Sequence, residues 1–144
     1  MRLLSLVLTL LLVTPLALAQ PTGRADRPMY DPATVETLKG SIRSVEMQPS
    51  QNGPGYGVHL TLAVGDETVP VHLGPSWFID NQDHQLAQGD AVEVVGSRVT
   101  KGDATFVIAR EVRQGELVLV LRDEAGLPAW RGRRHGQRGP RGPR

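Results

Sequence analysis

The segment that decides the fold runs from residue 74 to residue 97 and reads GPSWFIDNQDHQLAQGDAVEVVGS. It sets Trp77 and Phe78 side by side in a chain of which only 4% is aromatic. Pro75 suits the first turn of a helix, where a missing N–H leaves no hydrogen bond unmade. The segment therefore predicts one short helix whose Trp77 or Phe78 plugs an open end of a small β-barrel. The alternative for these rings is stacking on a ligand.

Strands are expected on both sides of this helix, because apolar and polar residues alternate there and β-branched residues are frequent. Gly-Asp pairs at residues 65–66 and 89–90 separate alternating runs, and such turns join antiparallel neighbours. Gly40 predicts a bend in the first strand. Pro70 has no N–H to donate and predicts a free edge or a bulge in the third strand. The expected strands cover residues 38–45, 58–64, 68–73, 91–100, 105–112 and 117–122.

Three strands, a connector with room for one helix, and two or three further strands form the plan of an OB-like barrel. We therefore predict an all-β fold for residues 33–130. It is a small five- to six-stranded antiparallel OB-like barrel with one short helix between strands 3 and 4. A small β-sandwich is the alternative, but it explains the single long connector less well.

The beginning of the chain differs from this domain in composition. Residues 1–19 combine Arg2, an uncharged apolar run and an ending of small residues at Ala19, which is the pattern of a secretory signal peptide. We expect cleavage after Ala19 and a periplasmic or secreted protein; an uncleaved membrane anchor is the alternative. Residues 20–32, which contain three prolines, are predicted to form a linker.

Charge divides the rest of the chain into an acidic body and a basic tail. Residues 20–128 contain nine Lys or Arg against fifteen Asp or Glu, whereas residues 131–144 contain six Arg and no acid. The Gly and Pro content of residues 131–144 predicts a disordered tail. Weak contact of this tail with an anionic surface is one expectation, and a solubilising role is the other. An acidic body in an exported chain does not favour nucleic acid as a partner.

The chain has no cysteine, which excludes disulfides, thiolate metal sites, cysteine nucleophiles and covalently attached c-type haem. It also lacks phosphate-loop and dinucleotide motifs, and it has neither a GxSxG nor an HExxH signature. Arg122 and Asp123 are expected to fix the exit of the last strand rather than to bind a substrate. We therefore expect no enzyme, no catalytic residues and no cofactor apart from the transition metal considered next.

His59 and His72 form the most specific local pattern. Both lie opposite the apolar face of the predicted hairpin around residues 65–66. A two-residue turn makes them direct cross-strand neighbours, about 5 Å apart at Cβ, whereas a four-residue loop makes them diagonal. Two neutral imidazoles at that spacing suit a transition metal if Asp80 or His84 completes the ligand set. The alternative is two solvated histidines on an exposed sheet face.

Four short segments carry a resemblance to a known family. They are LGPSWF at 73–78, GDAVEVVGS at 89–97, IAREV at 108–112 and LRDEAGLPAW at 121–130. The stretch from residue 35 to residue 130 resembles the C-terminal domains of magnetosome proteins of the MamS/MamX type, within a family of small exported bacterial OB-like domains. The resemblance implies metal or redox handling on the periplasmic side. Haem-carrying relatives have CxxCH motifs, which this chain lacks.

These segments are turns and a plug, so they specify a fold better than an activity. The leading expectation is a non-catalytic periplasmic binding or accessory module whose partner is a protein or a small molecule. The alternative is a metal-binding or redox-accessory protein that uses the hairpin of His59 and His72.

Overall fold

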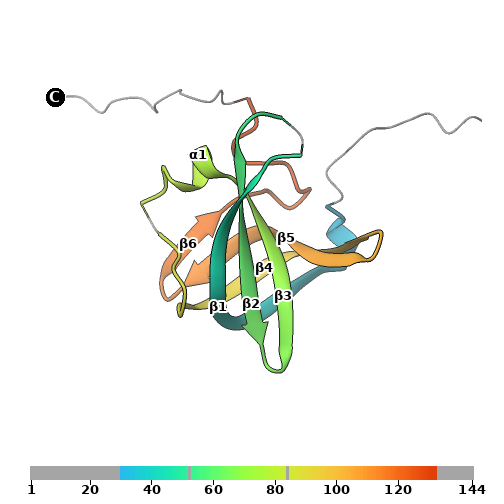
Figure 1. Cartoon of the computed structure of the whole chain (residues 1–144), viewed down its shortest axis with the longest axis vertical. Helices are drawn as coiled ribbons and strands as arrows, with labels where there is room; N and C mark the ends of the chain where they lie inside the picture. The colour runs from blue at the N-terminus through green and yellow to red at the C-terminus, as the bar shows by residue number, and fades with distance from the viewer. Residues whose placement is uncertain (1–29, 52, 84, 133–144) are drawn as a thin grey trace, which may run out of the picture.

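The computed structural model describes residues 30–51, 53–83 and 85–132. The predicted signal peptide, most of the predicted linker, His84 and residues 133–144 of the predicted tail lie outside this part of the chain. The described part is all-β with one short helix, as predicted. Its elements are η1 (Pro32–Thr34), β1 (Val35–Pro49), β2 (Tyr56–Val64), β3 (Glu67–Pro75), α1 (Ser76–Ile79), β4 (Ala91–Lys101), β5 (Ala104–Gln114) and β6 (Leu117–Val120) (Figure 1).

Five of the strands in the described part close into a ring. The hydrogen-bonded order is β3-β2-β1-β4-β5-β6, and β3 also pairs with β5. The β3–β5 pairing is parallel, and the others are antiparallel. β6 adds to the outer edge of β5 and lies outside the ring. This connectivity, with α1 between β3 and β4, follows the OB-like plan expected from the sequence.

β1 joins the two halves of the ring because it pairs with two strands in succession. Residues 35–41 pair with β4, and residues 41–49 pair with β2. The change of partner falls beside Gly40, where the sequence predicts a bend. A Cβ atom at Gly40 would overlap the carbonyl oxygen of Ala63, so no larger residue fits there.

The inward side chains of the ring form one apolar core. Alternate residues of each strand point inward, and in this chain those residues are mostly valine and leucine. Each such side chain contributes about 1.5–3 kcal/mol to folding when it is fully buried, which is how a chain without disulfides holds its shape. The largest of its fully buried side chains are those of Ile42, Leu60, Leu62, Val69, Val71, Leu73, Val94, Val107, Val112 and Leu121.

Aromatic side chains close one end of the ring. Phe78 of α1 is only 5% exposed and belongs to the core, whereas Trp77 is partly buried against it. Phe78 is therefore the predicted plug. Pro75 is the N-cap residue of α1, one position before the predicted first turn. Trp130, from the segment after β6, packs beside Phe78 with ring centroids 5.3 Å apart, a contact that the sequence does not predict.

The residues before β1 also contact the ring. The amide of Asp31 donates a hydrogen bond to Ser97 Oγ on β4 at 3.0 Å, and Thr34 Oγ1 lies 2.8 Å from the same oxygen. Contact with the ring thus begins before residue 33, the predicted start of the domain. Within the described residues, no helix is long and apolar enough to span a membrane.

Candidate functional site

His59 and His72 are direct cross-strand neighbours on β2 and β3. The turn between these strands has two residues, because Val64 pairs with Glu67, and the register from there sets His59 opposite His72. Of the two registers that the sequence leaves open, the two-residue turn is the one found. The imidazole centroids are 4.1 Å apart, in an edge-to-face arrangement with an interplanar angle of 61°.

A third ring, Phe106 of β5, completes what we call the histidine cluster: His59, His72 and Phe106. Phe106 stacks on His72 with centroids 4.1 Å apart and an interplanar angle of 10°. Both histidines are half-buried, so they lie between the predicted pair of metal ligands and the alternative of two fully solvated side chains. Sequence reasoning misses Phe106, because alternation gives its side of the strand but not the strand that lies next to it.

Burial favours the neutral form of both imidazoles. Burial, and after it the nearby His59 and Arg122, lower the pKa of His72 to about 4. Burial also lowers the pKa of His59, although the negative charge of Glu46, its cross-strand neighbour on β1, acts in the opposite direction. At neutral pH the cluster is therefore an uncharged stack of rings, and it offers no positive charge to an anionic ligand.

A metal site needs more ligands than the two imidazoles. Among the described residues, no group of three or more His, Asp or Glu side chains is placed to hold a metal ion. Asp80 is exposed at the C-terminal end of α1, and His84 lies outside the described residues. The structure thus brings His59 and His72 together but adds no third ligand from its described part. Metal binding by this pair remains a prediction.

Arg122 lies where the ring closes. It is only 9% exposed, and its Nη1 donates hydrogen bonds to the carbonyl oxygens of Leu73 on β3 (2.9 Å) and of Ala109 on β5. Its guanidinium carbon lies 4.9 Å from the centroid of the Trp130 ring. Burial lowers the pKa of Arg122 to about 10, so the side chain remains charged at neutral pH. The backbone of Arg122 bridges to that of Pro128 at the exit of the last strand, and its side chain links β3 to β5.

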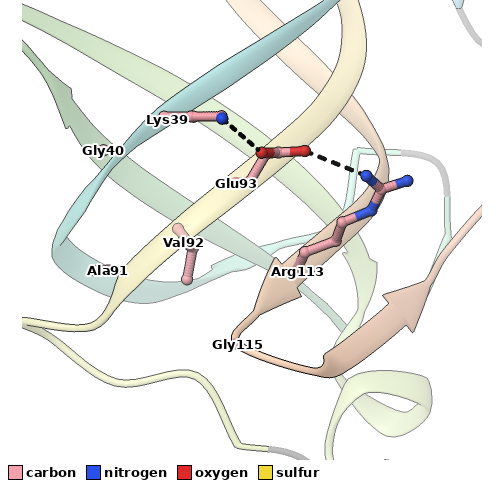
Figure 2. A pocket seen from close by; sticks show the side chains of 7 residues that line it. All are labelled: Lys39, Gly40, Ala91, Val92, Glu93, Arg113 and Gly115. Carbon is pink, nitrogen blue, oxygen red and sulfur yellow. Dashed lines mark hydrogen bonds and ion pairs between the residues drawn. The ribbon is translucent and has the colours of Figure 1, made fainter.

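A shallow recess of about 420 Å³ lies over β1, β4 and β5 (Figure 2). Glu93 stands at its centre, with Lys39 Nζ at 3.4 Å from one carboxylate oxygen and Arg113 Nη1 at 3.2 Å from the other. Arg113 also pairs with Glu111. Both cations that line the recess already have carboxylate partners, and exposed pairs of this kind are weak. The recess therefore has neither the free charge nor the enclosure of a ligand site.

The edge of β6 is the most exposed apolar feature of the sheet. Leu117, Val118 and Val120 are 53%, 52% and 53% exposed, while Leu119 between them is buried in the core. In the described part of the chain β6 pairs with β5 alone, so its other edge is open. Sequence reasoning identifies this strand but not its position at the end of the sheet, which depends on the strand order.

Comparison with known protein families shows the family of this chain. No curated protein and no solved structure matches the chain. The model of the MamS/MamX magnetosome protein family matches residues 34–119, which cover every strand from β1 to β5 and most of β6. Because this match covers more than half of the 144 residues, the chain belongs to the MamS/MamX magnetosome protein family.

Proposed function

We propose that this domain is a non-catalytic periplasmic binding module that holds a short extended segment of a partner protein along the open edge of β6. The proposal rests on one observation, an apolar strand edge that lies exposed. Folded proteins usually protect such an edge with lysine, proline, a bulge or a covering segment. The residues Leu117–Val120 contain neither lysine nor proline, and three of the four side chains are about half exposed.

The backbone of β6 is ready to accept a further strand. The turn between β5 and β6 has two residues, because Gln114 pairs with Leu117. Hydrogen-bonded and non-hydrogen-bonded pairs alternate from such a turn, so the N–H and C=O groups of Val118 and Val120 point away from β5. An extended segment beside β6 would bond to these groups, as in recognition by strand addition.

The open edge is short. Beyond β6 the chain folds back along itself, with the amide of Ala129 donating to the carbonyl of Leu121 at 2.9 Å. The amide of Asp123 likewise donates to the carbonyl of Leu127 at 3.1 Å. This fold-back covers the edge after β6 and leaves Leu117–Val120 open, so the segment bound there spans about four residues.

The surroundings of the edge favour an uncharged, apolar segment. Val118 lies opposite Arg113 and Val120 lies opposite Glu111 on β5. These two charged side chains pair with each other, so neither is left to attract a charged partner. Apolar or β-branched residues placed opposite Val118 and Val120 would add cross-strand contacts of about 0.2–1 kcal/mol each. The alternative role in metal handling has less support, because the histidine cluster provides only two ligands from the described part of the chain.

Site-specific photo-crosslinking tests the proposal in cells that export the protein. A photoreactive amino acid at position 118 should give one defined adduct with another protein. The same amino acid in place of Thr68, an exposed residue of β3, should give none. Adding Val120→Lys to the position-118 protein should abolish the adduct and leave the melting temperature unchanged, because a lysine on an open edge opposes strand pairing.

Two results would overturn the proposal. Equal adducts at positions 118 and 68 would show that contact at β6 is not specific. An adduct of twice the mass of the chain would identify a second copy, rather than another protein, as the occupant of the edge.

A further inference from the structure

The two ends of the open β6 edge differ in charge. At its beginning, the exposed Glu116 of the two-residue turn comes directly before Leu117. At its end, the amide of Ala129 donates to the carbonyl of Leu121, the first residue after β6. Arg131 follows Ala129 by two residues and is exposed, so the Cα atoms of the two lie within about 8 Å of each other. The edge thus runs from an acidic residue at one end to a basic residue at the other.

A turn fixes the point at which the basic tail begins. The amide of Arg131 donates to the carbonyl of Pro128 at 3.0 Å. Inside this turn, the ring of Trp130 packs beside Phe78 and lies 4.9 Å from the guanidinium carbon of Arg122. These contacts hold the turn against the end of the ring. The tail therefore starts next to the end of the open edge.

The sequence of the tail supplies positive charge from this point onward. Residues 131–144 contain six arginines and no acidic residue, and five of the arginines fall within residues 133–144. A chain of twelve residues spans at most about 40 Å, whereas the four residues of β6 span about 13 Å. The arginines are thus within reach of a segment that extends past either end of the edge.

The acidic side chains of the fold-back between Leu121 and Ala129 do not cancel this charge. Asp123 Oδ1 accepts a hydrogen bond from the amide of Leu127 at 2.8 Å, so this carboxylate is engaged within the fold-back. Glu124 is exposed three residues after Leu121, which is roughly 10 Å further along the chain. Two carboxylates against six guanidinium groups leave an excess of positive charge at this end of the edge.

We propose that the segment bound along β6 carries Asp or Glu residues just beyond the end at Ala129, where the arginines of residues 131–144 pair with them. The inference rests on the proposed function, because it names the partner of the same edge. The four residues on the edge itself are apolar. At the other end Glu116 repels a further acid, so the acidic residues lie on one side only. Charges placed in this way set the orientation of the bound segment as well as its affinity.

Photo-crosslinking from position 118, in cells that export the protein, tests the pairing with the natural partner. Changing all six arginines of residues 131–144 to glutamine should reduce the adduct several-fold at an equal amount of protein. Changing the same six residues to lysine should leave the adduct unchanged, because lysine keeps the positive charge. Both variants should keep the melting temperature of the wild type, so a loss of the adduct is not a loss of folding.

Mass spectrometry of the adduct identifies the bound segment, and a synthetic peptide of that segment gives its affinity for the purified protein. Acidic residues should flank the crosslinked site on one side only. Replacing them with glutamine should weaken binding about 10-fold at 0.15 M salt, which is about 1.4 kcal/mol and corresponds to two or three exposed ion pairs. The replacement should have little effect on the protein with the glutamine tail. It should also have little effect in 1 M salt, where the screening length is about 3 Å.

Failure of this inference and failure of the proposed function give different results. An adduct at position 118 that does not depend on the arginines would overturn the acidic flank and leave the β6 edge as the binding site. The absence of a defined adduct at position 118 would overturn the proposed function and the acidic flank with it. A bound segment with uncharged or basic flanks would overturn the inference as well. So would a glutamine tail that reduces binding to anionic vesicles but not the adduct, since the arginines would then serve a membrane surface.

Discussion

Replacing Arg122 with methionine should destabilise the domain by about 2 kcal/mol, because the change removes a buried guanidinium and keeps most of the apolar stem. The carbonyl oxygens of Leu73 and Ala109 both lose their donor, and each buried group left unpaired costs about 1–3 kcal/mol, or about 4 kcal/mol for the two. The contact with Trp130 contributes roughly 1 kcal/mol more. Against this, burial lowers the pKa of Arg122 from 12.5 to about 10, which corresponds to a cost of roughly 3 kcal/mol for burying the charged side chain. The methionine variant avoids this cost.

Urea unfolding at neutral pH, followed by tryptophan fluorescence, measures the difference. Arg43→Met on β1 is the matched control, since Arg43 is exposed and its replacement should change the free energy of unfolding by less than about 0.5 kcal/mol. An Arg122→Met protein as stable as the wild type would refute the reasoning. It would mean that the contacts of the guanidinium contribute no more to the free energy of unfolding than the burial of its charge costs.

Three further predictions follow from the plug and the tail. In the same urea assay, Phe78→Ala should lower the free energy of unfolding by about 3–5 kcal/mol, because Phe78 lies in the core, and Trp77→Ala by only about 1–2 kcal/mol, because Trp77 is partly exposed. Equal losses for the two variants would contradict this assignment of the plug. A Cβ atom at position 74 would lie 2.5 Å from Trp130 Cη2, so Gly74→Val should displace the Trp130 ring. The variant should lower the free energy of unfolding by about 1–3 kcal/mol and shift tryptophan emission to longer wavelength; unchanged emission would argue against the displacement. Deleting residues 133–144 should leave the melting temperature unchanged and weaken co-sedimentation with anionic vesicles at low salt, an effect that 1 M salt should remove.

Features that depend on neighbouring residues could be predicted from the sequence. One of the two registers left open for His59 and His72, the one with a two-residue Gly-Asp turn, is the one found, and of the two rings predicted as the plug, Trp77 or Phe78, it is Phe78 that lies in the core. Phe106 and the side-chain contacts of Arg122 could not be predicted in the same way. Their contacts depend on β5 lying beside β3. These two strands are not consecutive in the chain, because β4 and the connecting segments on both sides of it lie between them. Alternation fixes the side on which a residue lies, but it does not fix the neighbouring strand.

The same non-local contacts define where the domain ends. The family match stops at residue 119, yet Arg122 bonds to the carbonyl groups of Leu73 and Ala109, next to the pairing of β3 with β5, and Trp130 completes the plug. The pairing of β3 with β5 is only two residue pairs long, and Pro70, which has no N–H, cannot extend it, so these later residues supply contacts that the strands themselves do not. The segment after β6 is therefore part of the folding unit. It also sets the length of the open β6 edge, because its backbone covers the strand beyond Val120. Closure of the ring and exposure of the proposed binding edge thus depend on the same ten residues after β6, 121–130.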